Sequence, residues 1–258
     1  IDDEMKIITR PHINSLIRHE NNGNIIVQED GVINSNYNIQ LVNDGYGDID
    51  IQGTIISDNG NIYLTKNENS VGKIDVSGNI KNNGTWVVRD DGYLRVITGV
   101  INIHHDGIAD SNGDLINVKD TGVLETQNLI VIKRANKEQG DINLDGTLSS
   151  DCEMNIYTPS DLNIEGDLES RRIYFTISDS GNINLDRGSI SLKDDSDLWG
   201  GPSTISLNSD AGDIIIDGLV YGNSGGNISI MSETGAITIK EHGYVNNINS
   251  KIELISYG

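Results

Sequence analysis

Short apolar runs alternate with polar residues along most of the chain. The first motif is Gly, then Asn or Asp, then Ile-x-Ile, Ile-x-Leu or Ile-x-Val, where x is usually polar. Because successive side chains of a strand point to opposite sides, this period of two predicts short strands with one buried face. Clear copies begin at Gly23, Gly47, Gly60, Gly140, Gly181, Gly212 and Gly226, and looser copies begin at Gly72 and Gly235.

A second motif, Gly-x-Ile, Gly-x-Leu or Gly-x-Val, follows many of these copies after a few residues. Its copies begin at Gly53, Gly78, Gly146, Gly188 and Gly218. Gly permits left-handed or otherwise strained corners between strands, and Asn and Asp tolerate such corners and can stack in ladders. Strand–corner–strand units that cannot bury their faces alone are expected to stack into one continuous core.

The spacing of the first motif predicts a solenoid. The motif recurs 24 residues after Gly23, at Gly47, and then after steps of 13 and 12 residues at Gly60 and Gly72. Coils of about 20–25 residues follow, and the half-steps indicate two similar faces per coil. No window sustains the apolar spacing of a helix. We therefore predict an all-β, single-stranded parallel β-helix with right-handed winding.

The repeat divides the chain into two predicted parts. Residues 23–258 form the β-helix, and residues 1–22 form an N-terminal cap or an inter-subunit strand. A bare terminal coil would expose strand edges and core, so a segment that covers it is expected. The motifs are poorly matched at 84–140 and near 150–180, where we expect loops to interrupt the coils.

The repeated sequences resemble those of a known group of bacterial proteins. G-D-I-D-I-Q-G-T-I at 47–55, G-D-I-N-L-D-G-T-L at 140–148 and G-N-I-S-I at 226–230 are similar to the β-helical repeats of filamentous-haemagglutinin-type exoproteins and adhesins. The resemblance covers residues 23–258 as a style of repeat and implies a secreted or cell-surface protein. The Asn-Pro-Asn signatures of that family's secretion domain are absent here, so its export route does not carry over.

Composition and charge narrow the classes of partner that the protein can bind. The 258 residues include 29 Gly and one Phe, and the formal charge is −21. Such an acidic surface repels nucleic-acid phosphates and anionic lipid head groups, so neither is an expected partner. No segment reaches the ~20 apolar residues of a membrane span. Cys152 is the only cysteine, so no intramolecular disulfide can form.

Two acidic loops are candidate calcium sites, because Ca²⁺ prefers carboxylate and carbonyl oxygens. Calcium is the one cofactor that the sequence suggests, although ordinary turns explain both loops more simply. The first loop, at 110–114, begins like an EF-hand loop, but its glycine is misplaced and no closing Glu follows at the right distance. The candidate ligands are Asp110 and Asp114 in the first loop and Asp194, Asp195 and Asp197 in the second.

Catalytic constellations are weak. His104 and His105 are adjacent, and neighbouring residues of a strand point to opposite faces, so they cannot easily share one ion. Glu241-His242-Gly243 is the nearest approach to the Gly-His-Gly of pectinase-type hydrolases, and the Arg-Ile-Lys of those enzymes is missing. No catalytic residue is assigned, and we expect a protein that is not an enzyme.

Aromatic residues give no platform for sugar rings on sequence alone. Trp86, Trp199 and the nine Tyr do not fall at one repeat position.

The sequence favours an extracellular structural or adhesive β-helix. Its two ends would carry unpaired strand edges, so we expect end-to-end self-association into a surface filament or layer. Host or environmental glycans are a second possible class of partner. The alternative function is a carbohydrate-active β-helix, either a polysaccharide lyase or hydrolase or a glycan binder similar to a phage tailspike.

Overall fold

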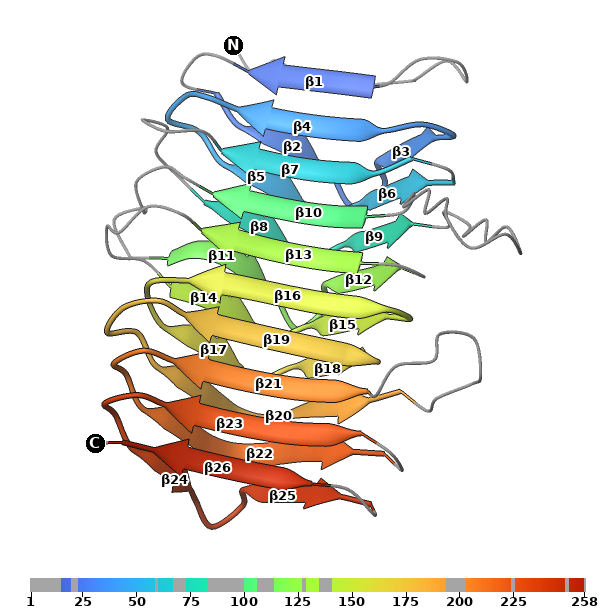
Figure 1. The fold of residues 1–258 in the computed structure, drawn as a ribbon. Helices are drawn as coiled ribbons and strands as arrows, with labels where there is room; N and C mark the ends of the chain where they lie inside the picture. The colour runs from blue at the N-terminus through green and yellow to red at the C-terminus, as the bar shows by residue number, and fades with distance from the viewer. Residues whose placement is uncertain are drawn as a thin grey trace, which may run out of the picture.

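The computed structural model shows a parallel β-solenoid (Figure 1). Every strand pairing in it is parallel, and the described residues contain no helix. In Figure 1 the front strands run from right to left and the return strands lie behind them as the chain descends from N to C, which is a right-handed winding. The predicted fold class is thus confirmed. The structure describes residues 15–19, 23–58, 60–66, 73–82, 100–105, 114–126, 129–134, 141–193, 203–223, 226–248 and 251–257.

One side of each coil belongs to a ten-stranded sheet, here called sheet A. Its strands, in order, are β1 (Ser15–His19), β4 (Ile39–Asn43), β7 (Ile62–Lys66), β10 (Val100–His105), β13 (Leu129–Arg134), β16 (Glu153–Thr158), β19 (Arg172–Ile177), β21 (Thr204–Ser209), β23 (Asn227–Ser232) and β26 (Ile252–Ser256).

The other two sides form a folded sixteen-stranded sheet. Wall B contains β2 (Ile25–Val27), β5 (Ile49–Ile51), β8 (Ile74–Val76), β11 (Asp114–Val118), β14 (Asp141–Leu144), β17 (Leu162–Ile164) and β24 (Ile237–Ile239). Wall C contains β3 (Val32–Ser35), β6 (Thr54–Ser57), β9 (Asn79–Asn82), β12 (Val123–Thr126), β15 (Thr147–Ser150), β18 (Asp167–Ser170) and β25 (Tyr244–Asn247). Two long strands, β20 (Ile183–Leu192) and β22 (Ile214–Gly222), each supply both walls.

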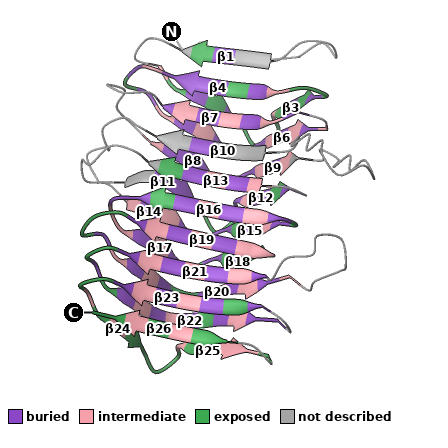
Figure 2. Ribbon diagram, in the orientation of Figure 1, coloured by how far each residue is buried: buried purple, intermediate pink, exposed green. Residues whose placement is uncertain are grey.

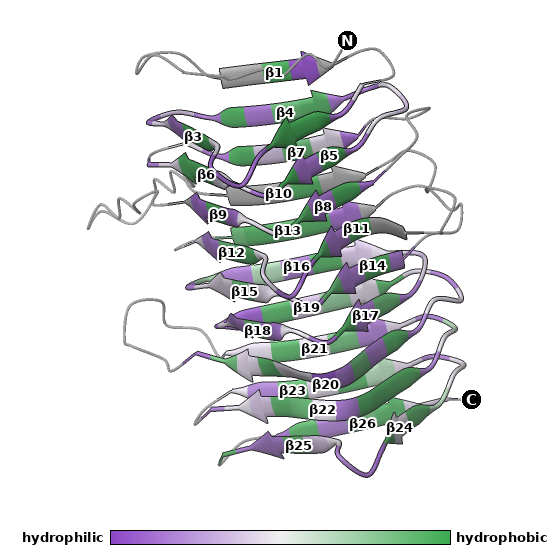
Figure 3. Cartoon of the chain, turned by 180° about the vertical axis from the view of Figure 1, so that it is seen from behind, coloured by the Kyte–Doolittle hydropathy of each residue, from purple (hydrophilic) through white to green (hydrophobic). Residues whose placement is uncertain are grey.

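The core is a set of stacked apolar columns inside these walls. In sheet A, Ile39 pairs with Ile62 and Leu41 with Leu64, and all four side chains are fully buried. The same in-register stacking continues from coil to coil, and Figure 3 shows hydrophobic and hydrophilic segments alternating along many of the strands. Period-two patterning therefore fills one continuous interior, as the sequence predicted.

The two motifs mark different walls. First-motif copies lead into both wall B and sheet A, for example β5 after Gly47 and β7 after Gly60. The half-steps of the spacing are therefore two walls that share the first motif. A third wall completes each coil, and the second motif begins it, as in β6 after Gly53.

Glycine is needed at the corners for close approach. A Cβ added to Gly166 would lie 2.0 Å from the carbonyl oxygen of Gly146, and one added to Gly212 would lie 1.9 Å from that of Gly181. None of these corner glycines has the positive φ that the sequence suggested. Arg187, with φ of 61°, is the non-glycine residue in the left-handed region among the described residues.

Coil length agrees with the prediction, while one predicted interruption does not. Hydrogen bonds between neighbouring coils commonly join residues 20 to 26 positions apart. Residues 150–180 were expected to contain a loop, but β16, β17, β18 and β19 continue the stack there. The motif is disguised in this coil because Ser160 stands where Gly occurs elsewhere and Leu162 replaces Ile.

The predicted N-terminal segment is described only in part. Residues 15–19 form β1, which pairs in register with β4, so the first strand of sheet A begins before Gly23. The described residues form no helix that is long and apolar enough to cross a membrane.

Candidate functional site

Most of the site residues suggested by the sequence lie outside the described residues. This applies to Asp110, Asp194, Asp195 and Asp197, and to Trp86 and Trp199. Asp114 is the first residue of β11, and His104 and His105 are the last two residues of β10, but their side chains are likewise outside the description. Calcium binding therefore stays a prediction.

His242 is described and belongs to a corner between walls B and C. Its Nδ1 lies 3.2 Å from Asp217 Oδ1, and its backbone N–H donates to the same oxygen at 3.1 Å. The imidazole is largely exposed. The neighbouring Gly243 packs closely against the preceding coil, because a Cβ added to it would lie 2.1 Å from the carbonyl oxygen of Ile216. This arrangement joins two coils and does not assemble a catalytic group.

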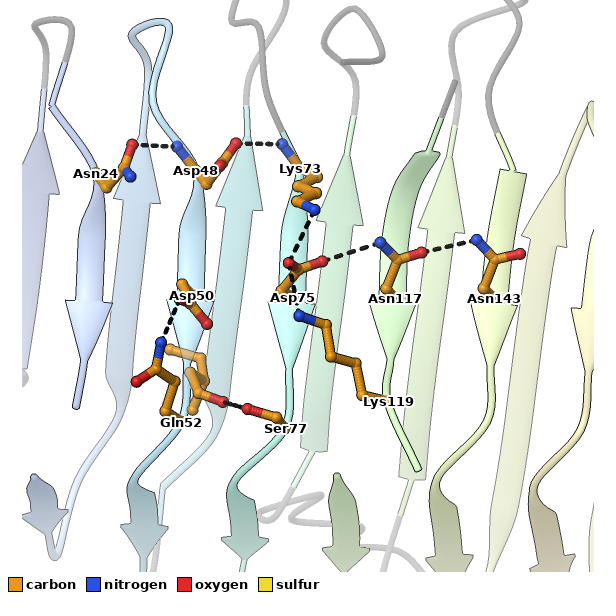
Figure 4. Close-up of polar contacts among 11 residues, drawn as sticks. Asn24, Asp48, Asp50, Gln52, Lys73, Asp75, Ser77, Asn117, Lys119 and Asn143 are labelled. Atoms are coloured by element: carbon orange, nitrogen blue, oxygen red, sulfur yellow. Dashed lines mark hydrogen bonds and ion pairs between the residues drawn. The ribbon is translucent and has the colours of Figure 1, made fainter. Parts of the chain in front are cut away.

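The outer surface of wall B carries a ladder of amides, shown in part in Figure 4. Each Asn occupies the outward middle position of its strand and donates its Nδ2 to the Oδ1 of the coil before it. The bonds are Asn184 to Asn163 (2.8 Å), Asn163 to Asn143 (2.9 Å), Asn143 to Asn117 (2.8 Å) and Asn117 to Asp75 (2.9 Å). The sequence suggested such ladders, and the structure places this one at the x position of the first motif.

Asp75 ends the ladder as its final acceptor. Its carboxylate is almost buried and lies 3.1 Å from the ammonium of Lys73 and 3.2 Å from that of Lys119. Figure 4 shows Lys73, from the same coil as Asp75, and Lys119, from the next coil, converging on it. A buried carboxylate is tolerated when charged donors satisfy its oxygens, so this cluster fastens adjacent coils.

The second residue of the first motif also bonds between coils. Its side-chain oxygen accepts the backbone N–H of the equivalent residue one coil later, which explains the preference for Asn or Asp there. The acceptor side chains and the backbone nitrogens that donate to them are Asn24 with Asp48 N (2.9 Å), Asp48 with Lys73 N (2.9 Å), Asp161 with Asn182 N (2.8 Å), Asn182 with Asp213 N (2.8 Å) and Asp213 with Ala236 N (2.8 Å). Figure 4 shows the first two of these five bonds.

A third polar column lies inside the solenoid, where the last inward side chain of several sheet A strands is polar. Each donates to the carbonyl of a first-motif Gly in the preceding coil. The bonds are Asn43 to Gly23 (3.1 Å), Lys66 to Gly47 (2.5 Å), Ser209 to Gly181 (3.1 Å), Ser232 to Gly212 (2.9 Å) and Ser256 to Gly235 (2.9 Å). The column satisfies backbone carbonyls that would otherwise be buried unpaired.

Lys66 is the charged member of this column. Its side chain is fully buried. Burial lowers the pKa of Lys66 to about 8, because desolvation disfavours the ammonium, while the nearby carboxylates of Asp48 and Asp44 partly oppose that shift. The pKa of Lys66 in the folded protein therefore lies much closer to neutral pH than the ordinary lysine value of 10.5.

The outward face of sheet A differs from the other surfaces. Strands β16, β19, β21 and β23 each present three outward side chains, and this set is called the sheet A patch. Its members are Glu153, Asn155, Tyr157, Arg172, Tyr174, Thr176, Thr204, Ser206, Asn208, Asn227, Ser229 and Met231. Register pairing places them in three parallel rows across the four strands.

The two charges of the patch neutralise each other. Arg172 Nε lies 3.5 Å from Glu153 Oε2, and Arg172 also donates to Cys152 Sγ at 3.6 Å. Burial acts to lower the pKa of Arg172, but the Cys152 contact and the Glu153 charge leave it raised. Burial, aided by Glu153 and opposed by Arg172, raises the pKa of Tyr174, so its hydroxyl remains a hydrogen-bond donor.

Wall C in the same coils is acidic. Carboxylates occupy its outward positions and its corner with wall B, namely Asp145, Glu165, Asp167, Glu169, Asp186 and Asp217. Arg187 lies beside Asp186, and Lys193, which follows β20, is paired with Asp151 at 2.7 Å. The −21 charge of the chain is therefore unevenly distributed, and the sheet A patch is a neutral strip on an acidic rod.

The last described coil exposes apolar residues at positions that are buried elsewhere (Figure 2). Leu254 of β26 pairs with Ile230 of β23. Ile230 is fully buried, whereas Leu254 is 47% exposed. Ile239 follows Ile216 in wall B and is 43% exposed. These side chains continue the core columns into the last described coil and are exposed there.

Chemistry that needs clustered ligands is not assembled by the described residues, which contain no group of three or more His, Cys, Asp or Glu placed to hold a metal ion. No protein-family model matches the chain, and no curated protein or solved structure shows significant similarity to it. The geometry of the solenoid therefore carries the functional argument.

Sequence reasoning missed the sheet A patch. Tyr157 and Tyr174 are 17 residues apart in a coil whose motifs are disguised, so no fixed repeat position joins them. The structure places them on adjacent strands in adjacent outward rows. A strand-by-strand alignment of β16 with β19 would have been the signal.

Proposed function

We propose that this protein is an extracellular structural or adhesive rod whose copies associate end to end. The observation that carries the proposal is the in-register parallel pairing of one coil with the next, because a second copy can continue such a stack as another coil does. In the last described coil, Leu254 and Ile239 continue the core columns and are exposed. Burying such apolar area yields about 25 cal/mol per Å², and adjacent strand edges offer backbone donors and acceptors. A second copy stacked on this coil would satisfy both.

The bonds between coils suit a structural role. Side chains on wall B, at the corners and inside the solenoid each bond to a neighbouring coil, as in Asn143 to Asn117, Asn24 to Asp48 and Ser232 to Gly212. A rod joined at several points per coil resists bending and local opening. Contact between unlike ends is heterologous, and it yields an open filament when its rotation does not close.

Electron microscopy of the purified chain tests this proposal. We expect rods in lengths that are multiples of one copy. The variant Leu254→Asp places a charge in the last described coil and should shorten the population to single copies. Leu219→Asp is the matched control, because Leu219 is also partly exposed but lies on the outward face of wall C. Single copies at every concentration, or equal behaviour of the two variants, would overturn the proposal.

The alternative carbohydrate-active function predicts a different result. A lyase or hydrolase would release reducing or unsaturated sugar ends from polysaccharides, whereas a structural rod releases none. Incubation with a panel of polysaccharides and a reducing-end assay separates the two, and sugar release lost on mutation of a described side chain would favour the enzyme.

A further inference from the structure

The sheet A patch combines many hydrogen-bonding side chains with a single ion pair, Glu153 with Arg172. We propose that this patch binds an uncharged polysaccharide chain lying across β16, β19, β21 and β23. The inference rests on the adhesive side of the proposed function and names its partner class.

The shape of the patch suits a long, flat ligand. Strands β19 and β21 are paired on both sides, so the interior of the patch offers no free backbone edge to an added peptide strand. Recognition must therefore come from side chains. Neighbouring strands lie ~4.8 Å apart, which is similar to the length of one pyranose unit in an extended glycan. Successive sugars can thus meet successive strands.

The chemistry of the patch suits sugar hydroxyls and ring faces. Asn155, Ser206 and Asn208 supply amide and hydroxyl groups that both donate and accept. Tyr157 and Tyr174 add an apolar ring and a polar tip from adjacent strands.

The charges of the patch and of the neighbouring wall C favour an uncharged ligand. The Glu153 and Arg172 charges are paired with each other, so the patch carries no net charge. The neighbouring wall C presents the carboxylates of Asp167 and Glu169 in the same coils. An anionic glycan would be repelled by the surrounding acidic surface, while a neutral chain meets no such cost.

Affinity gel electrophoresis tests the ligand class. The intact chain is run through gels that contain neutral glucan, mannan, galactan or xylan, or the anionic polygalacturonate. Retardation by at least one neutral polysaccharide and none by polygalacturonate is expected. Retardation by polygalacturonate alone, or by no polysaccharide in the panel, would overturn the inference.

Matched variants test the location. Tyr157→Ala should weaken binding of the retarding polysaccharide about tenfold, because a stacking contact and its hydrogen bond to the sugar are lost. Tyr244→Ala is the control, since Tyr244 is an exposed tyrosine on wall C. Ser206→Asp should also abolish retardation, whereas Ser191→Asp on wall C should not. Equal effects of patch and control variants would contradict the assignment.

The two proposals fail separately. Loss of glycan binding with normal filament formation removes only the partner assignment. Absence of filaments with glycan binding intact removes the end-to-end proposal and leaves the patch. Circular dichroism of each variant confirms that the β-solenoid is retained before either result is interpreted.

Discussion

At the residue scale, single side chains are placed so that each coil is bonded to the next. The wall B ladder shows this most clearly, because Asn143 both donates to Asn117 and accepts from Asn163. An amide in the middle of a ladder contributes more than one at its end, since removing it breaks two ladder bonds and leaves Asn117 Oδ1 and Asn163 Nδ2 without their ladder partner.

Asn143→Ala should therefore destabilise the protein by about 2 kcal/mol, and Asn184→Ala by about half as much. Asn184 is the matched control because it stands at the end of the same ladder and makes one ladder bond. Urea unfolding followed by circular dichroism measures the two differences. Equal costs for the two variants would show that the ladder bonds do not act in series.

Lys66 makes stability depend on pH in a defined window. Its folded pKa of about 8 lies below the unfolded value of 10.5, so between these values the unfolded state holds more protons and stability rises with pH. Relative to Lys66→Met, the natural protein should gain about 2 kcal/mol between about pH 7 and about pH 9.5. Urea unfolding of both proteins across this range measures the gain.

Comparison with Lys66→Met removes the contribution of the tyrosines and other groups, which titrate in both proteins. Parallel stability curves for the two proteins would mean that the ammonium is solvated in the folded state, against the full burial of Lys66.

At the element scale, short strands are positioned by the corners between them. The second-motif glycines stack directly, with Gly166 under Gly146 and Gly188 under Gly166. The carbonyl of each corner glycine accepts the backbone N–H of the next coil, as in Asp167 N to Gly146 O at 3.2 Å. A side chain at such a corner would push two coils apart.

Gly166→Ala should cost at least about 3 kcal/mol, because the added methyl would lie 2.0 Å from a backbone carbonyl that cannot move alone. Gly226→Ala is the matched control and should cost about 1 kcal/mol or less, since its nearest obstacle is the flexible end of Leu192 at 2.6 Å. Thermal unfolding of both variants measures the contrast. Similar losses would indicate that the corners are loosely packed.

The fold was predictable from such elements because Ile-x-Ile and Gly recur at visible spacing. The third wall was less visible, because its second motif has only one or two apolar anchors, as in Gly146-Thr147-Leu148. The coil at 150–180 was hidden because Ser160 and Leu162 replace the expected Gly and Ile. A local replacement that keeps size and polarity preserves the stack but erases the motif.

The candidate surfaces were harder to predict than the fold. The sheet A patch depends on which outward residues of separate strands become neighbours, and coil lengths vary enough to conceal that register. The pairing of β16 with β19, for instance, places Tyr157 and Tyr174 in adjacent rows of neighbouring strands. The exposure of Leu254 and Ile239 in the last described coil could not be predicted from the motifs, because both residues stand at positions that are buried in the coils before them.

At the scale of the whole molecule, the described coils form a rod with a neutral strip, acidic flanks and apolar side chains exposed in the last described coil. The acidic flanks repel one another in side-by-side contact, whereas the proposed stacking joins copies along the axis. On this proposal, particles should lengthen along the axis without becoming thicker.

Small-angle X-ray scattering over a concentration series tests this central claim most directly. End-to-end association predicts that the length of the scattering particle increases with concentration while its cross-sectional radius stays constant, and that Leu254→Asp abolishes the increase. A length that does not change with concentration, or a cross-section that thickens as the particle grows, would contradict the account.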